Sequence, residues 1–533
     1  MARFLVLLLL ALFLLLTGVA AAVGSWAWLA LAVLVAALLV LGVWDLLQSK
    51  HSVLRNYPVI GHLRYLLESI RPELQQYFVE RNIEGRPFDR YDRSLIYQRA
   101  KGVRSETSFG TELDVNEVGY EFLQHSTAPR DTPQEPHRVH VGGPDCTQPY
   151  DMSLLNVSAM SFGALSGRAI QAMNGGAALG GFAQDTGEGG LTEHHLSHGG
   201  DLVWELGTAY FGARTKDGLF DADEFAEKSA HPAVKCVELK LSQGAKPGLG
   251  GVLPAAKVDA DLARARDVKP GEAVVSPAYH RMFSTPRGLI EFLARMRELA
   301  GGKPVGMKLC VGSRHEVLAM CKAMLAEGTA PDFIVVDGAE GGTGAGPLEF
   351  QNRVGTPLTE GLVTMHNALV GTGLRDRVRI GASGKVATGA HIVMRLIQGA
   401  DYTNAARAMM MATGCIQSQL CHTNTCPVGV ATQDPLRIRA LDVEDKRHRV
   451  HRYHRDTVEE AVQIIASMGL GGPEELRPSM LRRVIAPLRV QGYDELYDWL
   501  QPGELLSQVP ESWAADWLAA DPDTFSRAQE VSR

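Results

Sequence analysis

The chain has 533 residues, a formal charge of −7 and 45% hydrophobic residues, which is enough for two or three domains and a sizeable core. The mild acidity and the lack of a long basic run argue against a nucleic-acid-binding protein. Seven unevenly spaced cysteines do not resemble the disulfide framework of a small secreted protein, so we expect a reducing compartment.

Two apolar segments open the chain. Residues 4–23 and 26–44 contain no charged side chain, and each is long enough to cross the hydrocarbon core of a membrane as a helix. A signal peptide cleaved after residues 20–22 is the alternative, but a cleaved signal does not need a second apolar segment. We therefore expect a two-helix transmembrane hairpin over residues 1–48.

Basic residues flank this hairpin on both sides. Arg3 precedes the first apolar segment, and Lys50, Arg55 and Arg64 follow the second. Positive charge marks the cytoplasmic ends of membrane helices. We expect a multi-pass protein of the cell membrane whose catalytic part lies in the cytoplasm.

The remainder of the chain divides into three regions of different composition. Residues 49–149 are charged, aromatic and rich in proline, and we expect a lead-in segment of short helices and loops. Over residues 150–435, short β-rich runs alternate with longer helical stretches, which predicts parallel strands joined by crossover helices. Residues 436–533 are charged, and we expect a helical C-terminal region. The β-rich runs are SLLNVSAM, GFAQDT, VKCVELKL, AVVSP, KPVGMKLC, DFIVVDGA, VRIGASG and ADYTNAA.

Eight such units fit one (β/α)8 TIM barrel. A doubly wound sheet is the rival fold, but it would need a glycine-rich fingerprint after its first strand, and MSFGALSG does not match one. Glycine-rich loops follow several of the runs, where a barrel builds its active site, and they suit a flat ring or a phosphate. These loops contain SAMSFGALS, DTGEGG, KLSQGAKPGLGG, DGAEGGTGAGP and GASGKVATG.

Three charged residues stand out near these loops. Lys308 lies inside the apolar run VGMKLC, where it either reaches solvent at the strand end or faces an anionic group such as a reduced flavin. Glu188 lies between glycines, and Lys246 precedes a Pro-Gly turn. Each is either an ordinary surface charge or a group that faces a ligand.

Cys415, Cys421 and Cys426 form a C-x5-C-x4-C pattern followed by proline. Three thiolates without a fourth suit a three-iron cluster with one open corner. Two structural thiols and a spare one are an alternative. The pair Cys421-His422 also raises a zinc site, although zinc motifs normally show paired short spacings.

The motifs SAMSFGALS, GEGG, QGAKPG, SP..H, GGTGA.P and CHTNTCPVGVATQ occur in this order between residues 150 and 435. In this order they resemble the synthase domain of glutamate synthase, which carries a flavin and an iron–sulfur cluster. The N-terminal hairpin resembles a stand-alone, membrane-linked branch of that family. The resemblance implies an FMN-binding barrel and a 3Fe-4S cluster on Cys415, Cys421 and Cys426. It implies FMN contacts from Met160, Ser161, Lys308, Gly341, Gly342 and Gly384.

The resemblance also implies an oxidoreductase acting on CH-NH2 donors, which reductively aminates 2-oxoglutarate to glutamate. Glu188, Lys246 and Arg266 match the family's substrate and proton-handling positions, and two cations suit a dicarboxylate. The family's amidotransferase domain is not in the sequence, so we expect ammonia from outside the chain. We expect the electrons to come from a donor protein or a reduced nicotinamide-linked partner.

Polar residues of the family are replaced at three positions of the sequence. PGLGGVLPA replaces PGEGGQLPG, so Leu249 and Val252 stand where the family has polar side chains, and Tyr210 stands where it usually has arginine. Fewer polar groups weaken recognition of a dicarboxylate. One alternative is therefore an FMN/iron–sulfur oxidoreductase for a less polar oxo or imine substrate. Another is a non-catalytic membrane redox or scaffold protein.

Overall fold

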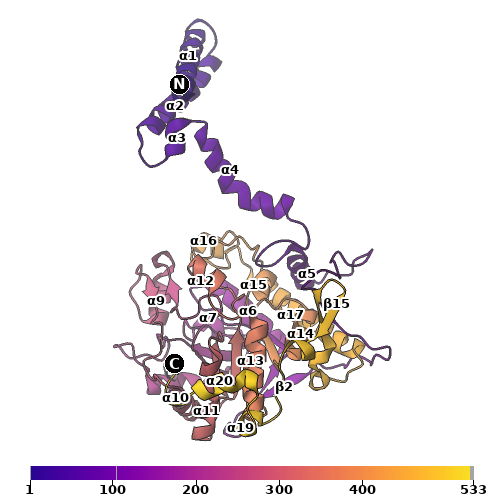
Figure 1. The fold of residues 1–533 in the computed structure, drawn as a ribbon. Helices are drawn as coiled ribbons and strands as arrows, with labels where there is room; N and C mark the ends of the chain where they lie inside the picture. The colour runs from indigo at the N-terminus through magenta and orange to yellow at the C-terminus, as the bar shows by residue number, and fades with distance from the viewer. Residues whose placement is uncertain (1, 104, 528–533) are drawn as a thin grey trace, which may run out of the picture. The chain divides into compact units, whose positions relative to one another are not determined.

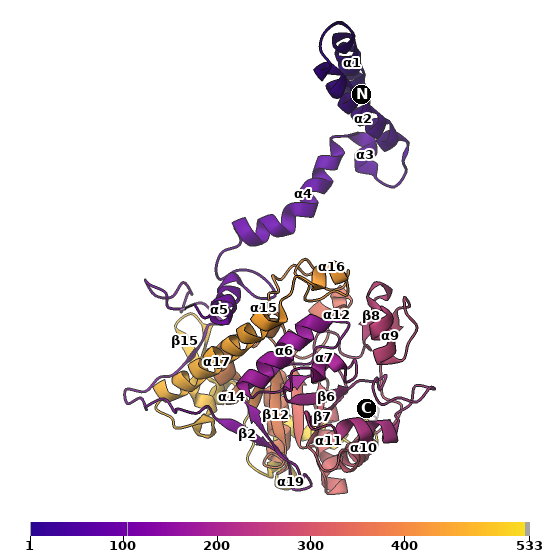
Figure 2. The same cartoon turned by 180° about the vertical axis from the view of Figure 1, so that it is seen from behind.

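The computed structural model describes residues 2–103 and 105–527, and the chain divides into two units, residues 1–90 and 91–533. In the first unit, α1 (Ala2–Val23) and α2 (Ala27–Leu47) lie side by side (Figures 1 and 2). Both helices are long and apolar enough to cross a membrane, which confirms the expected pair of apolar helices. The unit continues with α3 (Ser52–Asn56), α4 (Gly61–Leu74) and the π-helical turn η1 (Gln75–Val79).

The second unit is built around a closed barrel of eight parallel strands, as the sequence predicts. The strands follow one another around the barrel in chain order. They are β4 (Leu155–Val157), β5 (Gln184–Asp185), β6 (Leu202–Leu206), β7 (Val234–Lys240), β10 (Val305–Leu309), β11 (Phe333–Asp337), β12 (Arg379–Ser383) and β13 (Tyr402–Ala405).

Two of the strand assignments differ from the expectation. The run AVVSP is not a barrel strand: Val274 and Val275 form β9, which pairs only with β8 (Val252–Leu253). The third barrel strand is instead β6, which contains the charged Glu205 in an otherwise apolar run. A charged residue inside a strand breaks the hydrophobic pattern from which a strand is predicted. The residue that balances its charge comes from another part of the sequence, so local patterning does not explain the charge.

Helices follow the strands and cover the barrel (Figures 1 and 2). They are α6 (Gly167–Gly180), α7 (Glu193–Leu196), α8 (Ala222–Ser229), α9 (Ala260–Arg266), α10 (Pro286–Leu299), α11 (Arg314–Glu327), α12 (Leu348–Arg353), α13 (Leu358–Gly371), α14 (Gly389–Ile397) and α15 (Arg407–Ala412). The helix α5 (Arg90–Lys101) precedes the barrel, and the short helices η2 (Ala255–Lys257) and α16 (Pro435–Ile438) lie in its loops.

The long helix α17 (Val443–Ser467) packs against α6 and α14. Glycines make this close packing possible: a Cβ at Gly176 of α6 would lie 2.5 Å from Val450 Cγ1, and one at Gly389 of α14 would lie 2.6 Å from the backbone nitrogen of Ala461. At the other end of the barrel from α9 and α16, the hairpin β2 (Arg138–Val141) and β3 (Tyr150–Ser153) packs under the strands (Figure 2).

The C-terminal region is not only helical. Part of the stretch PEELRPSMLRRVI forms β14 (Leu481–Ala486), which pairs with β15 (Arg489–Gly492) and with β1 (Glu121–Leu123). The pairing partner β1 lies far away in the sequence, so local patterning does not reveal this sheet. The remaining short elements are η3 (Pro473–Glu475), η4 (Pro478–Met480), α18 (Tyr493–Leu496), α19 (Glu504–Ser507) and α20 (Glu511–Ala519).

Candidate active site

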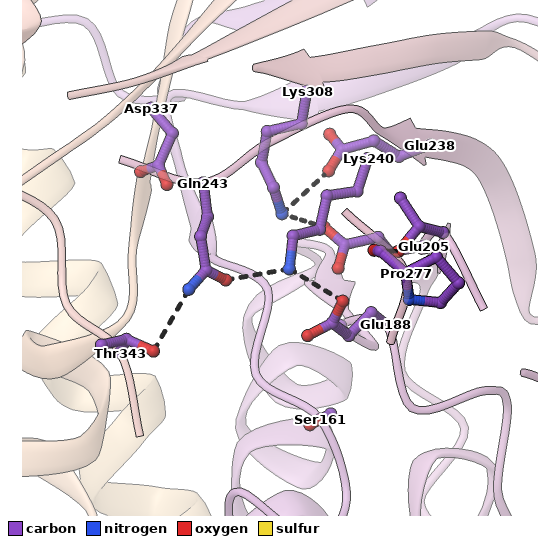
Figure 3. A network of polar contacts seen from close by, with 12 residues as sticks. Ser161, Glu188, Glu205, Glu238, Lys240, Gln243, Pro277, Lys308, Asp337 and Thr343 are labelled. Atoms are coloured by element: carbon purple, nitrogen blue, oxygen red, sulfur yellow. Dashed lines mark hydrogen bonds and ion pairs between the residues drawn. The ribbon is translucent and has the colours of Figure 1, made fainter. Parts of the chain in front are cut away.

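Polar side chains gather at the C-terminal ends of the barrel strands (Figure 3). Lys240 is the last residue of β7, and its ammonium group lies 3.0 Å from the carboxylate of Glu188 in the loop after β5. Lys240 also donates a hydrogen bond to the side-chain oxygen of Gln243 at 2.8 Å. Gln243 in turn donates to the hydroxyl of Thr343, which lies in the loop after β11, at 3.1 Å. The contacts tie three strand-end loops together.

Glycines leave space around Glu188. A Cβ at Gly207 would lie 2.7 Å from Glu188 Cβ, so only glycine fits there. Burial raises the pKa of Glu188, but the charges of Lys240, Arg266 and Lys246 outweigh burial and bring this pKa below its ordinary value. Glu188 is therefore an ionised carboxylate surrounded by three cations. The structure thus brings together the three residues Glu188, Lys246 and Arg266.

Arg266 ends α9 and is 6% exposed. Its Nη2 donates to the hydroxyl of Ser161 at 3.2 Å and to the carbonyl oxygen of Phe162 at 2.9 Å. The guanidinium group also lies over the ring of Phe211, 5.2 Å from its centroid. Among the residues that the structure describes, the buried Nε atom of Arg266 has no hydrogen-bond partner. A buried donor of this kind is costly unless a ligand accepts from it.

Lys246 is 2% exposed, and burial lowers the pKa of its ammonium group. Two apolar side chains lie near it in the sequence: Leu249 is 36% exposed and Val252, in β8, is 45% exposed. The loop after β7 therefore combines one buried cation with exposed apolar surface.

Tyr210 stands where the family usually has an arginine, but it supplies no positive charge to the site. It is buried with a positive φ of 52°, and its hydroxyl lies 2.9 Å from Nδ1 of His280. Nε2 of His280 lies 2.8 Å from the backbone carbonyl oxygen of Lys240. Because a carbonyl only accepts, Nε2 donates to it and Nδ1 accepts from Tyr210. Burial lowers the pKa of His280 to about 4, so its imidazole is neutral. The hydrogen bonds from Tyr210 to His280 and from His280 to the backbone of Lys240 hold the end of β7 in position.

Lys308 of β10 lies deeper in the barrel and is 4% exposed. It does not snorkel to solvent: its ammonium group makes ion pairs with Glu205 of β6 and, at 3.2 Å, with Glu238 of β7. A third carboxylate, that of Asp185 in β5, lies beside them. Sequence analysis did not single out these acids, although an acid inside an apolar strand run is the signal that would have found them.

The glycines expected at FMN lie on the loops after β11 and β12. A Cβ at Gly342 would lie 2.9 Å from Cδ of Arg407, and Gly384 has a φ of 151°. Arg407 follows β13, donates to the carbonyl oxygen of Glu340 at 2.7 Å, and has a pKa lowered by burial. Barrel enzymes commonly bind a phosphate at the ends of their last two strands. A glycine cradle beside a buried guanidinium group therefore fits the phosphate of FMN.

Met160 and Ser161 lie at the end of β4, across the barrel mouth from Gly341 in the loop after β11. Glycine is required between them and the next loop, because a Cβ at Gly187 would lie 2.5 Å from the backbone nitrogen of Ser161. The two loops therefore pack backbone against backbone here, without side-chain bulk between them. A backbone surface of this kind fits a flat ring such as that of FMN.

The three cysteines of the C-x5-C-x4-C pattern are free thiols, and Cys426 is buried. Burial raises the pKa of Cys415 to about 12, and the charges of Cys421 and Cys426 add to this shift, so the three thiols lie close together. Among residues 2–103 and 105–527, they do not form a group whose ligand atoms all lie within 4.8 Å. Three neighbouring thiols fit a cluster that is held by three thiolates.

The backbone of the cysteine loop is turned by three non-glycine residues with positive φ, which are Gln417, Gln419 and Asn424. Lys257 of η2 is buried and donates to the carbonyl oxygen of Ala164 at 3.1 Å. Burial lowers its pKa to about 8, against the charges of Cys421 and Cys426, so it lies near these thiols. It links the SAMSFGALS loop to the cysteine loop, and sequence analysis missed it.

Residues 145–471, more than half of the chain, match the family described as a conserved region in glutamate synthase. The glutamate synthase large subunit-like protein YerD of Bacillus subtilis (strain 168) is 38% identical over 487 residues, which cover 83% of this chain and 92% of that protein. An archaeal-type glutamate synthase (NADPH) of Thermotoga neapolitana is 31% identical over 321 residues, 60% of each chain.

The ferredoxin-dependent glutamate synthase 1, chloroplastic/mitochondrial, of Arabidopsis thaliana is 35% identical over 265 residues. These cover 49% of this chain and 16% of that protein. The chain therefore spans most of the Bacillus relative but less than two thirds of the other two.

Proposed function

The chain belongs to the glutamate synthase family, and we propose that it is an FMN- and iron–sulfur-dependent enzyme that makes glutamate from 2-oxoglutarate. As a member of this family it is an oxidoreductase acting on CH-NH2 donors. The observation that carries the proposed substrate is the buried Nε of Arg266, which has no hydrogen-bond partner in the described part of the chain and belongs to a cation close to Glu188.

The proposed reaction consumes 2-oxoglutarate, ammonium, two electrons and two protons, and it yields glutamate and water. Arg266 and Lys246 bind the two carboxylates of the keto acid, since charge-assisted hydrogen bonds from buried donors are strong. Glu188 moves a proton at the nitrogen of the imine. Lys240 holds the carboxylate of Glu188 in place through the 3.0 Å ion pair.

We propose that FMN is held by Met160, Ser161, Lys308, Gly341, Gly342 and Gly384, with Arg407 at its phosphate. Bound there, FMN supplies the hydride for reduction of the imine. We propose that Cys415, Cys421 and Cys426 hold a 3Fe-4S cluster, which would supply single-electron transfer. Lys257 then places a positive charge beside two of the three thiolates.

The proposed reaction needs a source of ammonia and a source of electrons. Ammonia comes from outside the chain, and the electrons come from a donor protein or a reduced nicotinamide-linked partner. One relative is named as an NADPH enzyme and another as ferredoxin-dependent, so the family is compatible with both kinds of donor.

We propose that α1 and α2 anchor the protein in the cell membrane as a two-helix hairpin. Their length and composition support this role. The flanking basic residues, Lys50 and Arg3, support a cytoplasmic position of the catalytic unit; the side chain of Arg3 lies outside the part that the structure describes.

A second candidate function keeps the cofactors but changes the substrate to a less polar oxo or imine compound. The exposed Leu249 and Val252 beside Lys246 favour it. A non-catalytic redox or scaffold role has less support, because Glu188, Lys246 and Arg266 remain assembled. Replacing Val252 by glutamine tests the alternatives: the variant gains affinity for 2-oxoglutarate if this keto acid is the substrate, and loses activity on a less polar substrate if it is not.

A visible spectrum of the purified protein tests the cofactor proposal. Flavin bands together with a broad iron–sulfur shoulder support it. A colourless protein after anaerobic purification and reconstitution with FMN and iron contradicts it, and favours the non-catalytic role.

A further inference from the structure

Lys308 shares the barrel interior with three acids, Asp185, Glu205 and Glu238, which we call the interior carboxylate set. Figure 3 shows Lys308 with Glu205 and Glu238. Lys308 makes ion pairs with Glu205 and Glu238, and one carboxylate oxygen from each of the three acids lies within 4.8 Å of the other two. All four side chains are at most 4% exposed. The ammonium group of Lys308 takes the place that a metal ion would have among these carboxylates.

The charges of this group do not balance if every acid is ionised. Three carboxylates face one ammonium group, and adjacent buried carboxylates cannot all lose their protons. Burial, followed by the charge of Asp185, raises the pKa of Glu238 well above its ordinary value. Burial also raises the pKa of Asp185, against the charge of Lys308. One oxygen atom of Asp185 lies within 4.8 Å of one of Glu238, and two buried carboxylates at this distance hold one proton between them more readily than none.

Other groups of the barrel face this set. They are Lys240 and Cys236 on β7, Asp337 at the end of β11 and Tyr402 on β13. A cavity of about 10 Å³, room for about one water molecule, borders Asp185 and Glu238. Its other polar walls are Asn156, Tyr402 and Asn404. A water molecule there would give the carboxylates a path for proton exchange within the barrel.

The interior carboxylate set limits how far Lys308 can offset the negative charge of a reduced flavin. An unpaired lysine would offset the negative charge of a reduced flavin ring, but the charge of Lys308 is already opposed by Glu205 and Glu238. A negative ring next to Lys308 therefore repels the carboxylates across a medium of low dielectric constant. Protonation of one carboxylate removes this repulsion and leaves Lys308 free to pair with the ring.

We propose that Asp185, Glu205 and Glu238 take up one proton when bound FMN is reduced, and that they act through Lys308. The inference rests on the proposed binding of FMN at Lys308. The reductant supplies two electrons. One proton from solvent adds to the flavin ring and gives its anionic reduced form, and a second proton from solvent adds to a carboxylate of the set. The three acids are positioning residues, because they act on the cofactor through Lys308.

The test is the midpoint potential of the FMN-loaded full-length protein as a function of pH, over the range in which the spectrum of the reduced flavin is anionic. Each proton taken up per two electrons lowers the potential by about 30 mV per pH unit. The wild-type protein is expected to show about 60 mV per pH unit, and the double variant Asp185→Asn, Glu238→Gln about 30 mV. Glu298→Gln, an exposed acid on α10, is the matched control and should behave like the wild type.

A second measurement needs no variant. The infrared difference spectrum between reduced and oxidised wild-type protein should gain a protonated carboxyl band that shifts in D2O. Equal slopes in wild type and double variant, or a wild-type slope of about 30 mV without a new carboxyl band, overturn the inference while FMN remains bound. A protein that takes up no FMN overturns the proposed function itself, and this inference with it.

Discussion

Glu188 and Lys240 form a 3.0 Å ion pair that joins the loop after β5 to the last residue of β7. The pair connects a residue that sequence reasoning identified to one that it missed. Lys240 is also the largest of the three cationic influences on the pKa of Glu188. Lys240 therefore contributes most to keeping the carboxylate of Glu188 ionised.

Replacing Lys240 by methionine tests this role. Loss of the ammonium group removes the strongest effect that lowers the pKa of Glu188, so this pKa rises. If ionised Glu188 is the active form, the acid limb of the pH–rate profile moves to higher pH. The measurement is kcat/KM for the keto acid against pH. Lys228→Met on α8, whose partner is Glu224, is the control, and an unchanged acid limb in Lys240→Met would contradict the role.

Arg266→Ala tests the binding of a substrate carboxylate. A charge-assisted hydrogen bond contributes about 1.5–3 kcal/mol, so the affinity for 2-oxoglutarate should fall roughly 10- to 150-fold. The matched control is Arg264→Ala, since Arg264 lies on the same helix with an 80% exposed side chain. Steady-state kinetics with 2-oxoglutarate give the answer, and a KM equal to that of Arg264→Ala rules out the assigned contact.

Cys421→Ser tests the iron–sulfur cluster. A hydroxyl group is a poor ligand for iron in place of a thiolate, so iron content and the EPR signal of the oxidised protein should fall while FMN stays bound. Cys146→Ser changes a free thiol outside the loop and is the control. Iron retained at the wild-type amount in Cys421→Ser would show that this thiol is not a ligand.

Deleting residues 1–48 tests the membrane anchor. The two apolar helices are lost, and the truncated protein should move from the membrane fraction to the soluble fraction with its cofactors intact. Fractionation followed by a visible spectrum measures both properties. Full-length protein in the soluble fraction, or protein cleaved near Ala22, would exclude the hairpin.

The sequence predicts the barrel because alternating β-rich and helical runs depend on local residues. It does not predict β6, since Glu205 interrupts the apolar run and its partner Lys308 comes from a strand far along the chain. The sheet of β1, β14 and β15 escapes prediction for the same reason. The run AVVSP misleads because its two valines form only a short surface strand.

Some residues of the candidate site can be predicted from the sequence, and others cannot. Glycine-flanked Glu188 and the spaced cysteines have local signatures, and the sequence predicts them. Lys240 sits at the end of an apolar strand next to Glu238, with no glycine beside it, and only the ion pair with Glu188 reveals its role. The roles of Arg407 and Lys257 likewise depend on contacts between loops that come together only in the folded barrel.

The most direct test of the proposed function is glutamate formation by the protein loaded with FMN and iron. The chemically reduced protein, mixed anaerobically with 2-oxoglutarate and ammonium, should reoxidise its flavin and release one glutamate for each two electrons. The same mixture without ammonium should stay reduced. If loaded, reduced protein forms no glutamate even with excess ammonium, and if Val252→Gln does not restore the reaction, 2-oxoglutarate is not its substrate.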